Sequence, residues 1–528
     1  MRWPSLLGAV LAAALLPGAA AGDVRVEGAL HLRFTGLRDV PSTEVLFDPA
    51  TRVFLIDDYL ATTVDSRYGS TLAELSFDGR HLDGALHWRL ALDTGELRVR
   101  SFPALAVPCA APGSPSGLDV GARCRGMTML PRLGPLEVTW LEPAALTSNG
   151  RSIHDEVKST LLVREAYAAW IFGRAGFTTL RAGRARYGVA EGLVHDDYGT
   201  GVDLAVDLGA IGPPFELRAA LFQPTRDFPR TVAGLTPLAL LRADWLPSLF
   251  EHAGLFLAAR RDRTGSLAEL LRNAYVEDGV VSLSGLAPGS PEYVKTSFRL
   301  AGLLSADVTS TASLAWFGSS GSLGTFAGQR VLWTLAVMRG RIDTLQFASL
   351  PPQLDIPLHG SAAWLRYEVS PWPWIQVTPW FLYLSGDRPP PEKVRLGLAG
   401  GYGAFLGVNP YITATNLFFR GGLSETFAAR QATAPGVNGR GVIAPGLTLE
   451  LDAGRDVDLL ARVAWLRAED AGPWGGKAYG TEVDLSATWA PAPWVSFGAE
   501  LDALLPGDFF GVGATVYKTV LAVDLRTP

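Results

Sequence analysis

Charged residues in this chain recur at every second position, within short runs whose other residues are apolar. Glu482 and Asp484 form one such pair, and Glu500 and Asp502 form another in the following run. Carboxylates and guanidinium groups on one surface can pair with each other or guide a polar solute by hydrogen bonds. The same spacing places further arginines on such surfaces, at Arg89, Arg218, Arg299 and Arg366.

A second group of arginines lies close together in sequence. This group includes Arg164, Arg181, Arg184 and Arg186. The planar fork of arginine suits carboxylates and phosphates. If these side chains face a lumen, they would attract an anionic polymer. If they lie at the edge of a membrane leaflet, they would contact lipid phosphate. We favour the lumen.

No set of residues in the chain resembles a catalytic centre. The run His195-Asp196-Asp197 is the one place where a histidine adjoins two carboxylates, and a solvated turn explains it better than a metal site. There is no nucleophile elbow, phosphate-binding glycine loop or zinc-protease helix motif. A barrel enzyme would need a nucleophile beside a histidine, and no such pair is present. We therefore expect no enzymatic activity, no metal and no cofactor.

The chain has two cysteines, Cys109 and Cys124, in a stretch rich in proline and glycine. Outside the cytoplasm such a pair is expected to form a disulfide. A loop of this size would be stabilised by about 3 kcal/mol in the chain-entropy description.

Alternating segments must position these charges, because side chains of a strand point to opposite faces in turn. A soluble sandwich would bury the apolar face, whereas a membrane barrel would place it in lipid and the ionic face in a lumen. The many inward charges could not be buried dry, so they favour a wide barrel with a watery interior. We predict an all-β fold: a single large transmembrane antiparallel β-barrel of about 18 strands (16 to 20). The clearest segment alternates Val483, Leu485, Ala487 and Trp489 with Glu482, Asp484, Ser486 and Thr488.

The chain divides into three parts. Residues 1–21 read as a secretory signal peptide, with a basic start, an apolar middle and a small-residue cleavage site. Residues 22–67 form either the first strands or a periplasmic extension. Residues 68–528 form the barrel, with long extracellular loops near 94–158, 263–295 and 421–440. Tryptophans near the short turns are expected to form an interfacial girdle.

Composition narrows the partners and the location. Charged residues make up 19% of the chain, which is low for a soluble surface, and the net charge of −6 gives no reason to expect nucleic acid. We predict insertion in the outer membrane of a Gram-negative bacterium, in contact with its lipid.

Two sequence stretches resemble the alginate export family. The first is Arg164-Glu165-Ala166-Tyr167-Ala168-Ala169-Trp170 followed by Thr179-Leu180-Arg181-Ala182-Gly183-Arg184. The second comprises Gly480-Thr481-Glu482-Val483-Asp484-Leu485 and Leu505-Pro506-Gly507-Asp508-Phe509-Phe510.

This resemblance implies an eighteen-stranded outer-membrane barrel that exports an acidic exopolysaccharide, with Arg181 and Arg184 near its constriction. Periplasmic export machinery would then be a partner. The alternatives are a general or nutrient-specific porin that imports small hydrophilic solutes, and a barrel whose lumen is plugged, with the loop at 94–158 as the plug.

Overall fold

The computed structural model describes eighteen stretches and single positions of the chain: residues 24–48, 53–94, 97–100, 162–173, 177–224, 236–248, 251–263, 267, 287, 290–295, 311–324, 328–345, 354–387, 401–408, 410–419, 421–423, 436–472 and 475–527. The predicted signal peptide, Cys109, Cys124 and Arg299 lie outside these residues. So does most of the predicted loop at 94–158, although residues 97–100 of that range form a short strand.

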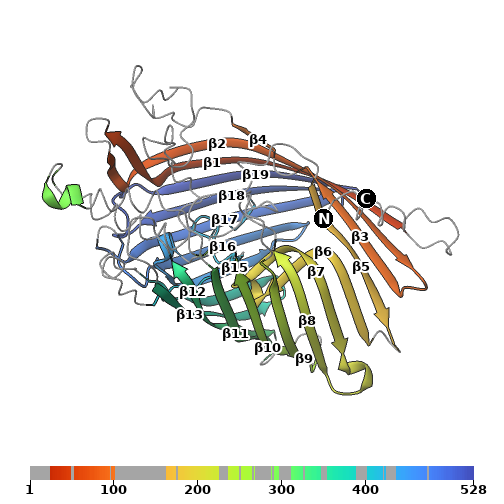
Figure 1. The fold of residues 1–528 in the computed structure, drawn as a ribbon. Coiled ribbons are helices and arrows are strands. Elements are labelled where there is room, and N and C mark those ends of the chain that lie inside the picture. Colours follow the sequence, from red (N-terminus) through yellow and green to blue (C-terminus); the bar gives the residue numbers. More distant parts are fainter. Residues whose placement is uncertain are drawn as a thin grey trace.

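The described residues form one antiparallel sheet that closes on itself (Figure 1). Apart from residues 97–100, which pair with the second strand, strands adjacent in sequence pair with each other. The first strand pairs with the last, with Phe34 opposite Leu521 and Thr35 opposite Val520. The strands of the first half are β1 (Val24–Asp48), β2 (Val53–His81), β3 (Leu86–Asp93), β4 (Leu97–Arg100), β5 (Leu162–Phe172), β6 (Thr178–Val189), β7 (His195–Asp207), β8 (Phe215–Pro224) and β9 (Leu238–Trp245).

The second half continues in the same up-and-down order. Its strands are β10 (His252–Asp262), β11 (Thr311–Gly324), β12 (Gln329–Leu345), β13 (Leu354–Trp372), β14 (Ile375–Leu384), β15 (Val442–Asp452), β16 (Val457–Arg467), β17 (Ala478–Ala492), β18 (Val495–Pro506) and β19 (Val516–Arg526). Three short 3-10 helices are η4 (Ala190–Gly192), η5 (Leu208–Ile211) and η6 (Val437–Gly439), and residues 291–295 also lie in a helix.

The ring has eighteen positions although it is built from nineteen strands. Both β3 and β4 pair with the same edge of β2, where Asp93 lies opposite Glu74 and Leu97 opposite Thr71. The two are thus one barrel strand interrupted by a short break. This confirms the predicted eighteen-stranded antiparallel barrel. Of the two alternatives for residues 22–67, the structure shows strands, because β1 and β2 belong to the ring.

The connections differ between the two ends of the barrel. At one end, which we call the tight-turn end, two to seven residues join each strand to the next, as at 373–374 and 493–494. The other end, which we call the long-loop end, carries the long intervals 101–161, 263–310 and 385–441. Among the residues described, no helix is both long and apolar enough to cross a membrane.

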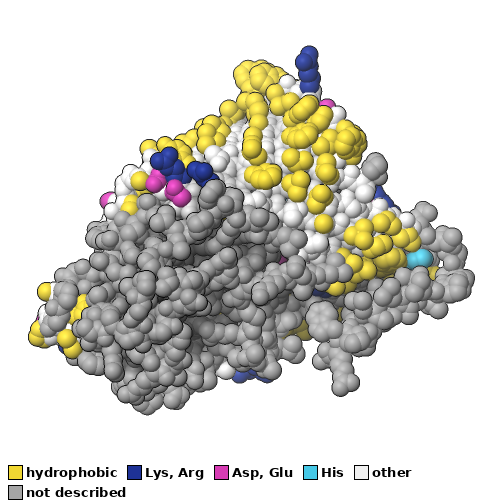
Figure 2. Space-filling model, turned by 90° about the horizontal axis from the view of Figure 1, so that it is seen from above, with side chains coloured by type: hydrophobic (Ala, Val, Ile, Leu, Met, Phe, Trp, Pro, Cys, Tyr) yellow, Lys and Arg dark blue, Asp and Glu magenta, His cyan; other side chains and the backbone are white. Residues whose placement is uncertain are grey.

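The outer surface of the ring is apolar. Leucine, valine and phenylalanine side chains at every second position point away from the lumen; Leu255 is 67% exposed and Leu521 is 61% exposed. Figure 2 shows such hydrophobic side chains gathered on one outer face. So large an exposed apolar surface is unfavourable in water, whereas it is the usual exterior of a barrel in lipid. The chain is therefore a transmembrane β-barrel.

Aromatic side chains gather at the tight-turn end. Trp372 and Trp374 stack at the turn between β13 and β14, with ring centroids 5.8 Å apart. Both are more than half exposed, as is Trp494 in the turn between β17 and β18. Their amphipathic rings suit the headgroup level of a membrane. The predicted girdle is present at this end, formed by Trp170, Trp245, Trp372, Trp374, Trp489 and Trp494.

Candidate functional site: the lumen

A row of ion pairs crosses the inner wall from β2 to β9. Arg181 on β6 and Arg218 on β8 both bind Asp203 on β7, with Arg181 Nη2 2.7 Å from Asp203 Oδ2 and Arg218 Nε 2.9 Å from Asp203 Oδ1. The register explains the contact, since Arg181 lies directly opposite Asp203. The two guanidinium groups therefore share one carboxylate.

The same row continues on both sides of this trio. Arg89 on β3 donates to Asp78 at 3.1 Å and lies 2.5 Å from Glu165. Arg164 donates to Glu74, with Nη2 2.7 Å from Oε2. Arg242 on β9 donates to Asp244 at 2.6 Å. Charges at this density on one side of a sheet need pairing and water, because an isolated buried charge is costly.

Arg164 reaches the lumen through a break in the strand pattern. The pairing of β3 with β5 shifts by one residue between Ala91 and Leu92. Arg164 occupies the shifted position and its side chain is 9% exposed, bound to Glu74. A bulge of this kind turns a side chain from one face to the other.

Arg184 and Arg186 do not line the lumen, which corrects the expectation from sequence. Arg184 lies opposite Thr200, on the same face as the exposed Val202 and opposite to that of Arg181. Arg186 pairs with Asp196 at 2.7 Å on that outer face, with 55% of its side chain exposed. Positions 181 and 184 are three apart, so a regular strand must direct them to opposite faces.

The opposite side of the lumen is covered by a stretch that we call the inner segment, the described residues between 401 and 423. Its first part is held by neutral contacts. Trp316 on β11 donates to the Leu406 carbonyl at 2.8 Å, and the Val408 amide donates to the Val194 carbonyl at 2.7 Å. The Tyr411 amide donates to the Gly192 carbonyl at 2.8 Å. The segment thus extends from β11 to the connection between β6 and β7.

The second part of the inner segment is held by charged groups. Glu482 on β17 accepts hydrogen bonds from the Leu417 amide at 2.6 Å and the Phe418 amide at 3.0 Å, and a third from the Thr415 hydroxyl at 2.8 Å. Glu500 on β18 accepts from the Leu423 amide. Hydrogen bonds to an ionised acceptor are about twice as strong as neutral ones, so these contacts fix the backbone of the segment.

Two further carboxylates face each other beneath the inner segment. Asp484 lies opposite Asp502, and this pair is flanked by Arg462 on β16 and Lys518 on β19 in the same row. Lys518 Nζ lies 3.3 Å from Asp502 and 2.7 Å from Glu500. Asn416 donates to Asp502 from its side chain and to Asp484 from its backbone, both at 3.1 Å.

These contacts with the inner segment change the interpretation of four predicted lumen residues. Glu482, Asp484, Glu500 and Asp502 lie on the inner wall as predicted, but each is at most 5% exposed. Their side chains contact the inner segment and do not face open water in the lumen. Of the other predicted residues, Arg366 also faces inward, with its guanidinium 4.6 Å from the centre of the Trp364 ring.

The sequence reasoning did not identify the inner segment itself. Its apolar residues, including Phe405, Phe418 and Phe419, do not alternate with polar ones as they would in a strand. The stretch also contains almost no charged residues. An aromatic stretch with almost no charge, placed mostly before the predicted loop at 421–440, was the available signal. The plug predicted at 94–158 lies almost entirely outside the described residues, and among the described residues the inner segment lies in the lumen.

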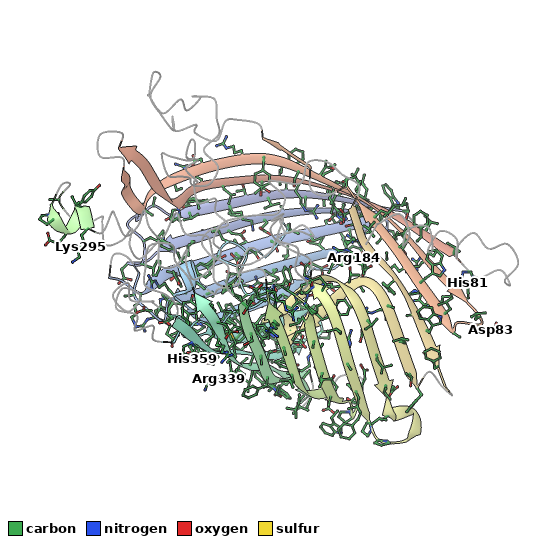
Figure 3. The ribbon with its side chains drawn as sticks, viewed as in Figure 1. His81, Asp83, Arg184, Lys295, Arg339 and His359 are labelled. Carbon is green, nitrogen blue, oxygen red and sulfur yellow. The ribbon has the colours of Figure 1, made fainter. Side chains whose placement is uncertain are left out.

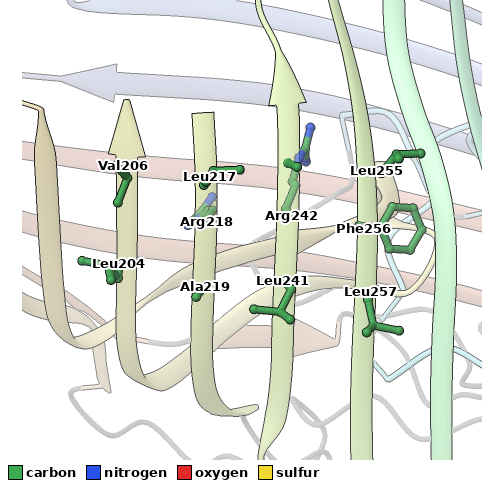
Figure 4. Close-up of a pocket in the computed structure, with 11 residues that line it drawn as sticks. Leu204, Val206, Leu217, Arg218, Ala219, Leu241, Arg242, Leu255, Phe256 and Leu257 are labelled. Carbon is green, nitrogen blue, oxygen red and sulfur yellow. The ribbon is translucent and has the colours of Figure 1, made fainter. Parts of the chain in front are cut away.

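An apolar groove of about 490 Å³ lies on the strands β7 to β10 (Figure 4). Leu204, Leu217, Leu241 and Leu257 line it, and smaller side chains such as Ala219 separate them. These leucines share the lipid-facing side of the wall, so the groove is distinct from the lumen. No group of three or more metal-ligating side chains occurs among the residues described.

Comparison with known proteins gives similarity of fold only. No protein-family model matches the chain, and no curated protein matches it. Similar solved structures, all from Pseudomonas aeruginosa, include OpdQ (10% identity, TM-score 0.45, covering 95% of this chain and 98% of that one). Others are the outer membrane proteins opdK (9%, 0.44, 95% and 98%) and OprD (10%, 0.42, 95% and 93%). None of these comparisons supports the alginate export family in particular.

Proposed function

We propose that this protein is a passive outer-membrane channel for small hydrophilic solutes. The barrel exterior suits lipid, and the signal-like start of the chain suits export to that membrane. Among the residues described, the inner wall carries paired charges. A solute would pass between the ion-pair row of β2 to β9 and the inner segment.

The observation that carries this proposal is the inner segment. A polysaccharide conduit needs a continuous bore wide enough for a sugar chain. Here the inner segment begins beside β13, where Tyr402 pairs with Leu358, and then crosses the lumen, bonded to β11, to the connection between β6 and β7, and to β17 and β18. A loop folded into a wide barrel narrows the path and selects small solutes. This favours uptake of small molecules over the polymer export that the sequence resemblance implies.

The proposal is tested by solute flux into liposomes that contain the purified barrel. We expect amino acids and monosaccharides to enter. An oligosaccharide of roughly ten or more sugars should be excluded, because the inner segment narrows the bore. Replacing residues 401–423 with a short Gly/Ser linker should admit larger sugars. Heat-modifiable migration in gels controls for folding. Free passage of the long oligosaccharide through the unaltered protein would contradict the proposal, as would the absence of any flux.

A further inference from the structure

The outer face of β10 to β13 carries a cluster of basic side chains near the long-loop end. Arg261 on β10 lies opposite Ser313, which in turn lies opposite Arg341 on β12. Arg339 lies opposite His359 on β13, and Figure 3 shows these two side by side. Adjacent strands are about 4.8 Å apart, so Arg261 and Arg341 are separated by roughly 10 Å. We call these four residues the basic patch.

The basic patch lies just beyond the apolar surface. Along β12, the outward positions Val331, Leu335 and Val337 precede Arg339. The eight residue-to-residue steps from Val331 to Arg339, at about 3.4 Å each and a tilt of about 40°, rise roughly 20 Å. The apolar band of a membrane barrel is about 25 Å tall. Arg341, two residues further on, therefore stands about where the acyl chains end and the headgroups begin, and Arg339 lies just below that level.

The arginine charge of the patch is only partly compensated among the residues described. All four side chains are exposed. Arg341 lies 2.6 Å from Asp343, but Arg261 and Arg339 have no carboxylate within 4 Å in the described part of the structure. Other outer arginines differ: Arg186 pairs with Asp196 at 2.7 Å and Arg38 with Asp39 at 3.0 Å.

We propose that the basic patch binds the phosphate groups of an anionic lipid in the leaflet at the long-loop end. Guanidinium groups bind phosphate through paired N–H donors, and those of Arg261 and Arg339 have no competing carboxylate among the residues described. An occupant at this level must place its acyl chains against Leu257 and Leu335 below and its phosphates among the arginines. A phosphorylated lipid meets both requirements. The patch lies outside the lumen, so this proposal is independent of the solute that the channel conducts.

The test is lipid binding by the detergent-solubilised barrel, measured by native mass spectrometry. The probes are lipid A with two phosphates and the same lipid after removal of its phosphates. The unaltered protein should bind the phosphorylated form preferentially. Combining Arg261→Gln, Arg339→Gln and Arg341→Gln should weaken that binding about tenfold or more, because each arginine near an anionic lipid contributes. The corresponding triple Lys variant should retain most of it.

A matched control removes three exposed arginines elsewhere, by Arg38→Gln, Arg67→Gln and Arg467→Gln. This control should bind lipid A as the unaltered protein does. Equal binding by the patch variant and the unaltered protein would overturn the proposal, as would equal loss in the control or equal binding of the dephosphorylated lipid. Displacement of lipid A by millimolar inorganic phosphate would also overturn it, since it would indicate a site for free phosphate. If the triple Gln variant fails to show heat-modifiable migration, lipid A binding is compared in the triple Lys variant and in the single variant Arg339→Gln instead. Unchanged lipid A affinity in Arg339→Gln would then overturn the proposal.

Discussion

At Asp484 and Asp502, two carboxylates lie opposite each other in adjacent strands, an arrangement that is unfavourable by itself. Arg462 and Lys518 flank them in the same row, and Asn416 of the inner segment donates to both. Removing one partner of a buried charge is usually more costly than the pair is favourable. The row therefore depends on the inner segment, and the segment depends on the row.

Glu482 allows the strength of this anchor to be measured. Glu482→Gln removes the charge from an acceptor of three hydrogen bonds, and each such bond to an ionised group contributes roughly 1.5–3 kcal/mol. We expect the inner segment to loosen, with a higher and noisier single-channel conductance in planar bilayers. Glu450→Gln on β15 is the control, because Glu450 makes no hydrogen bond with the segment among the described residues. Equal conductance in the two variants would show that Glu482 does not hold the segment.

Arg181 and Arg184 test which face of β6 lines the lumen. Arg181→Ser leaves Asp203 with one arginine partner in place of two, so the channel should become less favourable to anions. Arg184→Ser changes the outer face and should leave ion selectivity unchanged. The measurement is the reversal potential in a KCl gradient. A shift of equal size in both variants would contradict the register described for β6 and β7.

At the scale of elements, the closing of the ring depends on a single pair of strands far apart in sequence. β1 and β19 pair over ten residues, from Ala29 opposite Arg526 to Arg38 opposite Tyr517. An unpaired edge in lipid would leave several backbone groups without partners, each at a cost of several kcal/mol. Closure is thus the only arrangement of these strands that a bilayer tolerates.

This seam can be tested by a disulfide. Leu32 lies opposite Val523, and opposed residues of antiparallel strands are close enough for an S–S bond. The double variant Leu32→Cys with Val523→Cys should therefore form an intramolecular disulfide on mild oxidation, detected as a mobility shift that reductant reverses. Leu32→Cys with Tyr517→Cys, six residues out of register, should not. Cross-linking in the second variant alone would place the seam in a different register.

At the scale of the whole molecule, the barrel inverts the soluble arrangement, with apolar side chains outside and ionic ones inside. The cost of a charge should then depend on the face of the strand. Leu485 is 47% exposed on the lipid side, and its neighbour Ser486 points inward. Leu485→Arg should lower the free energy of unfolding by about 2–4 kcal/mol. Ser486→Arg should change it much less. Urea unfolding in lipid vesicles measures both, and equal losses would argue against lipid contact at Leu485.

The sequence alone determined the class of fold, because alternation is a local property. A strand such as β17, with Glu482 and Asp484 between Val483 and Leu485, shows its two faces without reference to any neighbour. Counting such strands also predicted the number of positions in the ring. The prediction for the arginines of β6 is only partly right, because it places nearby charges on one surface although strand geometry separates Arg181 from Arg184.

The tertiary structure alone decided what the inner charges bind. Nothing local to Glu482 or Asp502 indicates that the inner segment completes their hydrogen bonds. Leu417 and Phe418, whose amides donate to Glu482, lie more than sixty positions before it in the sequence. The inner segment has no periodic pattern, and its place depends on closure of the ring, which brings β11, β17 and β19 around one space. The alternation of apolar and polar residues can be read from the sequence alone. Which residues occupy the lumen depends on the strands that surround it, and these come together only in the folded barrel.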